Sequence, residues 1–437
     1  MQGHIKFLRR NLMCLAFLFS SLLFPTYLRA DQSLTLKDCF KAALKRSEVL
    51  ATQQELVIQA EENYHRAWAA ILPAINGSYS YFHQSGSGFS GSGNTSSSSG
   101  QQTLGLSADQ PLFRGFSDFA AVHEEKSFIK AQEQARQWAG MQLYRDVASA
   151  FYGRLSIQKD LNVLDNELGL YQKRIKELQS RLNIGRSRIT EVLTDQAAQA
   201  ILKAQREQVV GQWEVSKEVL SFLTGLDQDI QLDDTDDVPS NIGTLDSYQA
   251  QVNARPDIIA AQKNVDAYAS NVSVAKGGYL PAVDLISDYY GDRPDRAANG
   301  AWDVEIAVTL PIFTGGTISS KVKTAESLKR QSEIQYSQVK RLALEDIRSL
   351  YHNLKADLSQ MAALEEAFDI SERNYKANAQ DYEYNLVTNL DVLQALTAYQ
   401  DTQRSLEKIR YQAKIDVNLL EASVAHQLSL MEDLENQ

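Results

Sequence analysis

The chain has 437 residues, with 55 acidic and 44 basic side chains and a net charge of −11 at neutral pH. This length is ample for two domains of ordinary size. Nucleic acid is disfavoured as a partner, because binding it relies on a surplus of lysine and arginine. The only two cysteines, Cys14 and Cys39, exclude a framework of several disulfides.

The first 30 residues have the pattern of a secretory signal peptide. Basic residues precede an apolar run at 12–24, and a small residue, Ala30, ends the segment. The run of 13 residues is too short for a membrane anchor, which needs roughly 20. Cleavage after Ala30 would remove Cys14 and lower the net charge to about −15. Cys39 would then have no partner in the chain, and we expect it to be a buried structural thiol.

Three short motifs occur twice in the chain. Leu-Pro-Ala-Ile at 72–75 recurs as Leu-Pro-Ala-Val at 280–283, Pro-Leu-Phe-Arg-Gly at 111–115 as Pro-Ile-Phe-Thr-Gly at 311–315, and Glu-Val-Leu at 191–193 as Asp-Val-Leu at 391–393. The last two pairs are both 200 residues apart, which indicates an internal duplication. We predict a signal peptide at 1–30, a first structural repeat at 31–225, an acidic linker at 226–245 and a second repeat at 246–437.

The sequence contains no recognisable motif for catalysis or for a cofactor. The six histidines lack metal-ligand spacing, and the aspartates at 233–237 do not fit an EF-hand loop. No Walker loop, zincin motif or nucleophile elbow is present. A literal Gly-x-Gly-x-x-Gly at 86–91 lies in a Ser/Gly-rich run at 85–100, which predicts a flexible loop between two strands. We therefore predict no enzyme, no metal, no cofactor and a solvated acidic linker.

Each repeat has the predicted order helix, two strands, very long helix, tight turn and long helix. In the clearest strand, Trp302, Val304 and Ile306 alternate with Asp303 and Glu305, which gives one apolar and one polar face. The apolar residues of three further strands are Ile75, Tyr79 and Tyr81, then Leu104, Leu106 and Ala108, then Val283, Leu285 and Tyr289. Tilted strands of roughly 10 residues can cross a bilayer. A soluble sandwich is disfavoured, because four strands cannot cover their own apolar faces.

The segment 115–185 contains no proline and predicts a helix of about 67 residues, roughly 100 Å long. Its apolar seam has the heptad spacing of a coiled coil and consists of Leu161, Leu164, Leu168, Tyr171, Ile175, Leu178 and Leu182. The same positions 200 residues later are more polar and include Ser371 and Asn378. We therefore place the second helical hairpin on the side of a water-filled lumen.

The turns between the long helices have the same chemistry in both repeats. Gly185 and Asn385 lie 200 residues apart, and Gly and Asn best tolerate the left-handed conformation that ends a helix. The candidates for capping the returning helices are Ser187 or Thr190 in the first hairpin and Thr388 or Asn389 in the second.

Strands that span lipid must close into a barrel, because every backbone polar group needs a partner there. Four strands cannot close a barrel, and eight strands from two chains would leave an interior filled by side chains. Twelve strands from three chains leave a lumen that the polar strand faces would line. The predicted fold is mainly α with a small β part. Long antiparallel coiled-coil helices form a tunnel, and four transmembrane strands per chain contribute to a 12-stranded trimeric β-barrel.

The duplicated halves, the Leu-Pro and Pro-x-Phe-x-Gly motifs around two strands, and the turns at Gly185 and Asn385 resemble the TolC family of outer-membrane efflux proteins. The resemblance covers essentially the whole chain after residue 30. It implies a homotrimer in the bacterial outer membrane that contacts outer-membrane lipid and extends into the periplasm. It also implies docking to a periplasmic adaptor protein and an inner-membrane pump, as the exit duct of a tripartite efflux or type I secretion system.

The resemblance implies two sets of site residues. The adaptor-docking tips are Ile184, Gly185, Arg186, Ser187, Asn385, Leu386 and Val387. The periplasmic gate is Glu191, Tyr382, Asp391 and Gln394, with a bond expected between Tyr382 and Glu191. Gln394 departs from the acid of the best-known member, and Val387 stands where a second tie would need a basic residue.

The alternative interpretation is a non-conducting structural protein, such as a coiled-coil adhesin or envelope spacer. The polarity of the second helical seam and the polar strand faces argue against it, because both are suited to a water-filled lumen.

Overall fold

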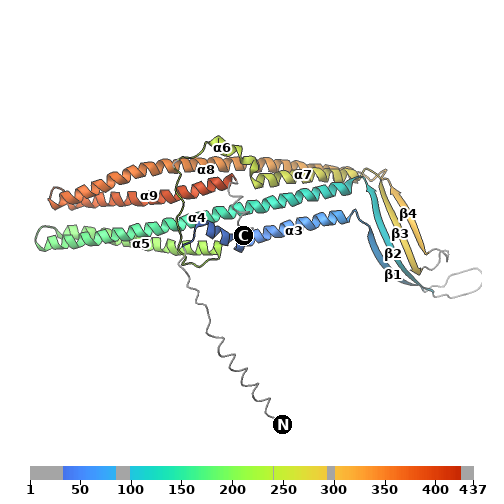
Figure 1. The fold of residues 1–437 in the computed structure, drawn as a ribbon, viewed down its shortest axis with the longest axis horizontal. Coiled ribbons are helices and arrows are strands. Elements are labelled where there is room, and N and C mark those ends of the chain that lie inside the picture. The colour runs from blue at the N-terminus through green and yellow to red at the C-terminus, as the bar shows by residue number, and fades with distance from the viewer. Residues whose placement is uncertain (1–32, 85–98, 240, 293–300, 425–437) are drawn as a thin grey trace, which may run out of the picture.

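The computed structural model describes residues 33–84, 99–239, 241–292 and 301–424. The predicted signal peptide at 1–30 and residues 85–98 of the predicted Ser/Gly-rich loop lie outside the described residues. The molecule is elongated. Its helices run along its length, with the strands at one end and the turns of two helical hairpins at the other (Figure 1).

The elements follow the same order in the two halves of the chain. The first half contains α2 (Leu36–Arg46), α3 (Glu48–Ala69), β1 (Ala74–Gln84), β2 (Ser99–Arg114), α4 (Ser117–Asn183) and α5 (Ile189–Thr224). The second half contains α6 (Leu245–Ala250), a 3-10 turn (Val252–Ala254), α7 (Pro256–Gly277), β3 (Ala282–Asp292), β4 (Trp302–Thr309), α8 (Thr317–Glu383) and α9 (Asn389–Ser423). α4 has the predicted 67 residues, and α8 has the same length.

The strands form one antiparallel sheet in the order β1-β2-β3-β4. Residues directly opposite each other on paired strands lie on the same face. Ile306 lies opposite Leu285 in β3, Tyr289 lies opposite Leu106 in β2, and Leu106 lies opposite Gly77 in β1. The apolar residues predicted separately for each strand therefore share one face of the sheet, and none of them is buried in the single chain.

β2 is longer than predicted and β4 is shorter. β2 has 16 residues, includes residues 99 and 100 of the predicted loop, and runs through the Pro-x-Phe motif to Arg114. It has a partner strand on both sides, and its ladder with β3 passes Pro111 through a register shift between Pro111 and Phe113. β4 has a partner on one side only and ends at Thr309, before Pro311. The second repeat of the motif therefore lies outside the sheet.

The predicted heptad seam of α4 forms the core of the first helical hairpin. Leu164, Leu168, Tyr171, Ile175 and Leu178 are buried, and the two end members of the seam are half-buried. Every equivalent seam residue of α8, from position 361 to 382, is only half-buried. The seam of the first hairpin is thus more deeply buried, because α4 has neighbours on both sides whereas α8 lies at the edge of the layer. Within the described residues, no helix is long and apolar enough to span a membrane.

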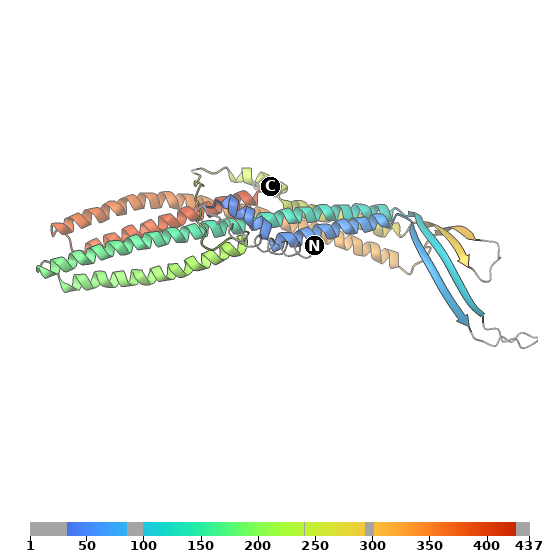
Figure 2. The same ribbon diagram turned by 60° about the horizontal axis from the view of Figure 1, so that its bottom comes forward.

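The helices form a single layer with two open sides. Next to the sheet, α3 packs on α4, α4 on α7, and α7 on α8. Toward the turns, α5 packs on α4, α4 on α9, and α9 on α8. One side of the layer is therefore formed by α3 and α5 and the other by α8 (Figure 1, Figure 2). The strands keep this order, with β1 on the α3 side and β4 on the α8 side.

Polar contacts join the two halves at mid-height. Arg255, just before α7, is 3% exposed and pairs with Asp257 at 2.9 Å and with Asp346 of α8 at 3.1 Å. Asp346 also pairs with Arg145 of α4 at 3.1 Å. Nearby, Cys39 of α2 is buried as predicted, and burial raises the pKa of its thiol to about 12.

The linker at 226–245 lies against α4 and α9. Its aspartates are exposed, but Lys414 of α9 pairs with Asp234 at 2.5 Å, and Tyr152 of α4 donates a hydrogen bond to Asp236. Two aspartate side chains of the linker, which was predicted to be solvated, thus bind to α4 and α9. Among the described residues, no group of three or more His, Cys, Asp or Glu side chains could hold a metal ion.

Candidate functional site

The turns of the two hairpins contain most of the predicted site residues. Gly185 and Asn385 both adopt the predicted left-handed backbone, with φ of 73° and 61°. In both turns the next residue donates its backbone N–H to the carbonyl five residues earlier, at 2.8 and 3.0 Å. The two turns therefore have the same backbone geometry, although one uses glycine and the other asparagine.

The predicted docking residues are mostly on the surface of these turns. Ile184 and Leu386 are 67% and 72% exposed, and Arg186 is exposed beside them. Ser187 and Val387 are half-buried. The turns thus present isolated apolar side chains and a basic side chain to solvent, at the end of the molecule farthest from the sheet (Figure 1).

α9 begins with a reciprocal cap, and of the two predicted candidates it is Thr388 that forms the cap. The Thr388 hydroxyl accepts from the N–H of Asp391 at 3.3 Å, and the Asp391 carboxylate accepts from the N–H of Thr388 at 2.7 Å. Hydrogen bonds from the Thr388 hydroxyl and then from its N–H lower the pKa of Asp391. The Asp391 carboxylate, which was predicted to lie at the periplasmic gate, therefore already accepts hydrogen bonds from the start of its own helix. Gln394, three residues later, is exposed.

α5 begins without a side-chain cap. Its N-cap residue is Arg188, so the prediction that Ser187 or Thr190 caps this helix is wrong. The Ser187 hydroxyl instead donates to the Glu191 carboxylate at 2.6 Å. This bond holds Glu191 in the first turn of α5, where the helix dipole favours a negative charge.

The structure brings Tyr382 of α8 against Glu191 of α5. The Tyr382 hydroxyl donates to the Glu191 carboxylate at 3.2 Å. The Tyr382 ring lies 4.8 Å from the guanidinium of Arg181 and 5.6 Å from that of Arg174. Burial, followed by the charge of Glu191, raises the pKa of Tyr382, so its hydroxyl remains a donor near neutral pH. The expected bond is present in a single chain, and its part in a gate stays a prediction.

A buried polar group just behind the turns was not predicted. Asp195 of α5 is 0% exposed and accepts from Arg174 of α4 at 2.7 Å and from the side-chain amide of Asn389 at 2.9 Å. Asn389 is the first residue of α9 and is 3% exposed. We refer to these three side chains as the Arg174 cluster. The feature of the sequence that could have indicated this buried group is Asp195, an acidic residue at the position where the second repeat has Ala395.

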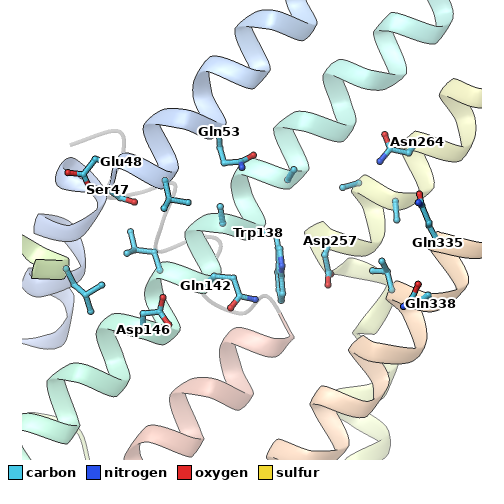
Figure 3. A pocket seen from close by; sticks show the side chains of 18 of the residues that line it. Ser47, Glu48, Gln53, Trp138, Gln142, Asp146, Asp257, Asn264, Gln335 and Gln338 are labelled. Carbon is cyan, nitrogen blue, oxygen red and sulfur yellow. The ribbon is translucent and has the colours of Figure 1, made fainter. Parts of the chain in front are cut away.

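A cavity of about 810 Å³ lies at mid-height between α3, α4, α7 and α8 (Figure 3). Its lining includes Trp138 and the carboxylates of Glu48, Asp146 and Asp257. Asp257 is already paired with Arg255, and burial raises the pKa of Asp146. Because α3 and α8 are the open sides of the layer, contact with a second copy would reshape this cavity. Its form in the single chain therefore does not define a ligand site.

Replacing Asp391 by Asn should fray the first turn of α9, because the cap depends on the carboxylate. A carboxylate whose pKa is lowered on folding stabilises the fold above its unfolded pKa, and this contribution is lost as the pH falls through the folded pKa. Amide protection at residues 391–393, measured by hydrogen exchange, should fall in Asp391→Asn, and in the wild type only under acid conditions. The matched control is Asp401→Asn on the exposed side of the same helix. Equal losses in both variants would contradict the cap.

Comparison with known proteins agrees with the fold and the duplication. The family model for the outer membrane efflux protein matches residues 40–226 and 247–426. The chain is 26% identical over 337 residues to the outer membrane protein TolC of Vibrio cholerae, which covers 74% of this chain and 76% of that protein. It is 23% identical over 397 residues to the cation efflux system protein CusC of Escherichia coli, which covers 85% of this chain and 83% of that protein.

The solved structure of the outer membrane protein VceC of Vibrio cholerae superposes with a TM-score of 0.78 at 22% identity, and covers 89% of this chain and 95% of that chain. The family match spans both halves of the chain and includes both hairpins. We conclude that the chain belongs to the outer membrane efflux protein family and is a transport protein of the outer membrane, not an enzyme.

Proposed function

We propose that three copies of this chain form a channel that crosses the outer membrane and continues through the periplasm, as the exit duct of a tripartite efflux or type I secretion system. The observation that carries the proposal is an exposed apolar sheet face bounded by two free edges, β1 and β4. A single chain can neither cover this face from water nor pair its edge strands in lipid. A closed ring of strands surrounded by lipid meets both needs.

The two open sides of one chain are suited to a second copy. The helices at these sides carry exposed apolar side chains, which are Val49, Ile58, Ile201, Val215 and Phe222 on α3 and α5, and Leu328, Ile334, Leu342 and Ile370 on α8. A neighbour that pairs its β4 with β1 also brings its α8 against α3 and α5, because strands and helices have the same lateral order. Such head-to-tail contacts close into a ring. Three copies are the smallest ring that leaves a lumen.

The second face of the sheet is suited to line that lumen. Asp284 and Asp288 of β3 and Asp303 and Glu305 of β4 lie on it by the strand register. Asp284 pairs with Arg114 of β2 at 3.3 Å, and both side chains remain partly exposed. Charged side chains are costly against lipid but remain hydrated beside water.

Docking of the hairpin turns to a periplasmic adaptor is part of the same proposal. With the sheet in the membrane, a helix of 67 residues carries the turns roughly 100 Å away from it. The exposed Ile184, Arg186 and Leu386 would then face an adaptor that connects the channel to an inner-membrane pump. Glu191 and Tyr382 lie just behind these turns, where a periplasmic gate would narrow the lumen.

Recording in planar bilayers tests the channel directly. Purified protein should give discrete conductance steps, and chemical crosslinking in detergent should give a ladder that stops at three. A crosslinking ladder that stops at two would contradict the trimer. Protein that enters the bilayer without any conductance would favour the non-conducting envelope protein instead.

Arginine at Val304 should block assembly of the barrel, since this side chain lies on the apolar face of β4. An arginine facing lipid near the midplane costs about 2–4 kcal/mol per chain. Ala307→Arg places the same residue on the opposite face, across from Asp284, and should assemble with altered ion selectivity. Trimer yield in outer-membrane fractions measures both variants. Equal yields would contradict the assignment of the faces.

Gly185→Val should abolish export while leaving trimers intact. A side chain at Gly185 would meet no atom within 4 Å, so the constraint is its φ of 73°. A β-branched residue there stores strain of about 1–3 kcal/mol, which is enough to reshape the turn but not to unfold the helices. The control is Gly185→Asn, the residue type that the second turn uses, which should export nearly normally. Normal export by the valine variant would remove the turn from the mechanism.

A further inference from the structure

We propose that the Arg174 cluster is a buried contact that holds the two hairpins of each subunit together in the closed channel, in addition to the Tyr382 bond. The inference rests on the proposed channel function and identifies Arg174, Asp195 and Asn389 as positioning residues for its gate. None of the three belongs to the site residues that the sequence predicted.

The three side chains form a closed ring of hydrogen bonds. Arg174 donates through Nε to Asp195 at 2.7 Å, and through Nη2 to the backbone carbonyl of Asn389 at 3.2 Å and to its side-chain oxygen. Asn389 donates its side-chain N–H to the second oxygen of Asp195 at 2.9 Å. Each member therefore contacts both of the others, and both carboxylate oxygens are used.

Within the Arg174 cluster, the bonds that join the first hairpin to the second are those of Asn389. Arg174 lies on α4 and Asp195 on α5, so this ion pair belongs to the first hairpin, whereas Asn389 begins the returning helix of the second. Separating the hairpins would break the three bonds of Asn389 and leave the ion pair whole. The Arg174–Asp195 ion pair thus forms a charged site on the first hairpin, and this site binds the first turn of α9.

The internal duplication shows that this arrangement is not a general feature of the hairpin packing. In the equivalent positions, 200 residues away, Asn374 replaces the arginine, Ala395 replaces the aspartate and Ile189 replaces the asparagine. The second hairpin therefore has no counterpart of the ion pair, and the first has no counterpart of Asn389. The cluster is present only where the first hairpin receives the second.

Burial makes the contact selective for the closed arrangement. The side chain of Arg174 is 12% exposed and that of Asp195 is 0% exposed, so water does not compete for their bonds while the hairpins touch. Arg174 also lies 5.6 Å from the ring of Tyr382, which connects the cluster to the Tyr382 bond. Losing a hydrogen bond to a charged group shifts an equilibrium by about tenfold or more.

Three variants test the proposal in purified trimers. Asn389→Leu keeps the approximate size of the side chain but removes its two side-chain bonds, leaving only the backbone carbonyl as an acceptor, and should raise the mean conductance about tenfold. Asn389→Asp should open the channel at least as far, because it places a second carboxylate against Asp195. The double variant Asp195→Asn, Asn389→Asp exchanges the carboxylate and the amide, so that Arg174 now forms its ion pair with the residue at position 389, across the hairpins. This variant should return the conductance to the wild-type level.

A matched control comes from the same hairpin. Arg206 of α5 pairs with Asp165 of α4 at 2.6 Å and with Glu207 at 3.2 Å, so both partners lie in the first hairpin, and these side chains are more exposed to solvent than those of the cluster. Arg206→Gln removes an ion pair of the same type and should leave conductance unchanged. Hydrogen exchange at residues 389–393 gives a readout independent of conductance. It should accelerate in Asn389→Asp and recover in the exchange variant, which a loss of helix packing alone would not do.

The outcomes separate this inference from the proposed function. If wild-type trimers conduct and Asn389→Leu matches them in conductance and in hydrogen exchange, the cluster has no part in closing. If the exchange variant stays open, the effect comes from packing and the pairing proposed here is wrong. A wild-type protein that never conducts would overturn the channel and this gate contact together.

Discussion

A four-stranded sheet with one exposed apolar face and two free edges is the constraint on which the rest of the structure depends. Lipid can cover the face, but only other strands can satisfy the edges, so in the proposed channel the sheet pairs with copies of itself. The connections between the strands and the helices are closely packed, so the arrangement of the strands also determines that of the helices. At Gly115, with φ of 61°, a Cβ would lie 2.4 Å from the carbonyl oxygen of Gly277, so β2 and α4 are joined directly against α7. The lateral order of the strands thereby becomes the lateral order of the tunnel.

Within that layer, buried and half-buried ion pairs fix how the halves align along their length. Apolar seams alone are tolerant of sliding, whereas a paired charge has one favourable position. Arg145 of α4 pairs with Asp346 of α8 at 3.1 Å at mid-height, and Arg404 of α9 pairs with Asp160 of α4 at 2.6 Å farther along. The Arg174 cluster does the same next to the turns. The first and second hairpins are therefore connected by directional contacts at several heights, and the Arg174 cluster and the Tyr382 bond are the ones that lie next to the turns.

The sequence predicted what is set locally. The faces of the strands, the length of α4 and the left-handed turns follow from alternation, from the absence of proline and from Gly185 and Asn385, and the structure has all three. It did not predict the contacts set by distant partners. The extension of β2 depends on pairing with β3, and Asp195 acquires its role only when α9 packs beside it. Ser187 or Thr190 was expected to cap α5, but Arg188 is the N-cap residue and the Ser187 hydroxyl donates to Glu191.

The two hairpins share a fold but differ in their buried charges. In the first, Arg174 neutralises the buried Asp195. In the second, Asp357 and Asp416 lie together between α8 and α9, and burial followed by the charge of Asp416 raises the pKa of Asp357 to about 6. The equivalent positions of the first hairpin are an isoleucine and a serine, at 157 and 216. The charge of Asp416 disfavours the ionised form of Asp357, whereas the charge of Asp195 is compensated by Arg174. Duplication supplied two hairpins of nearly equal length, and substitution then gave the first a buried ion pair and the second a pair of neighbouring carboxylates.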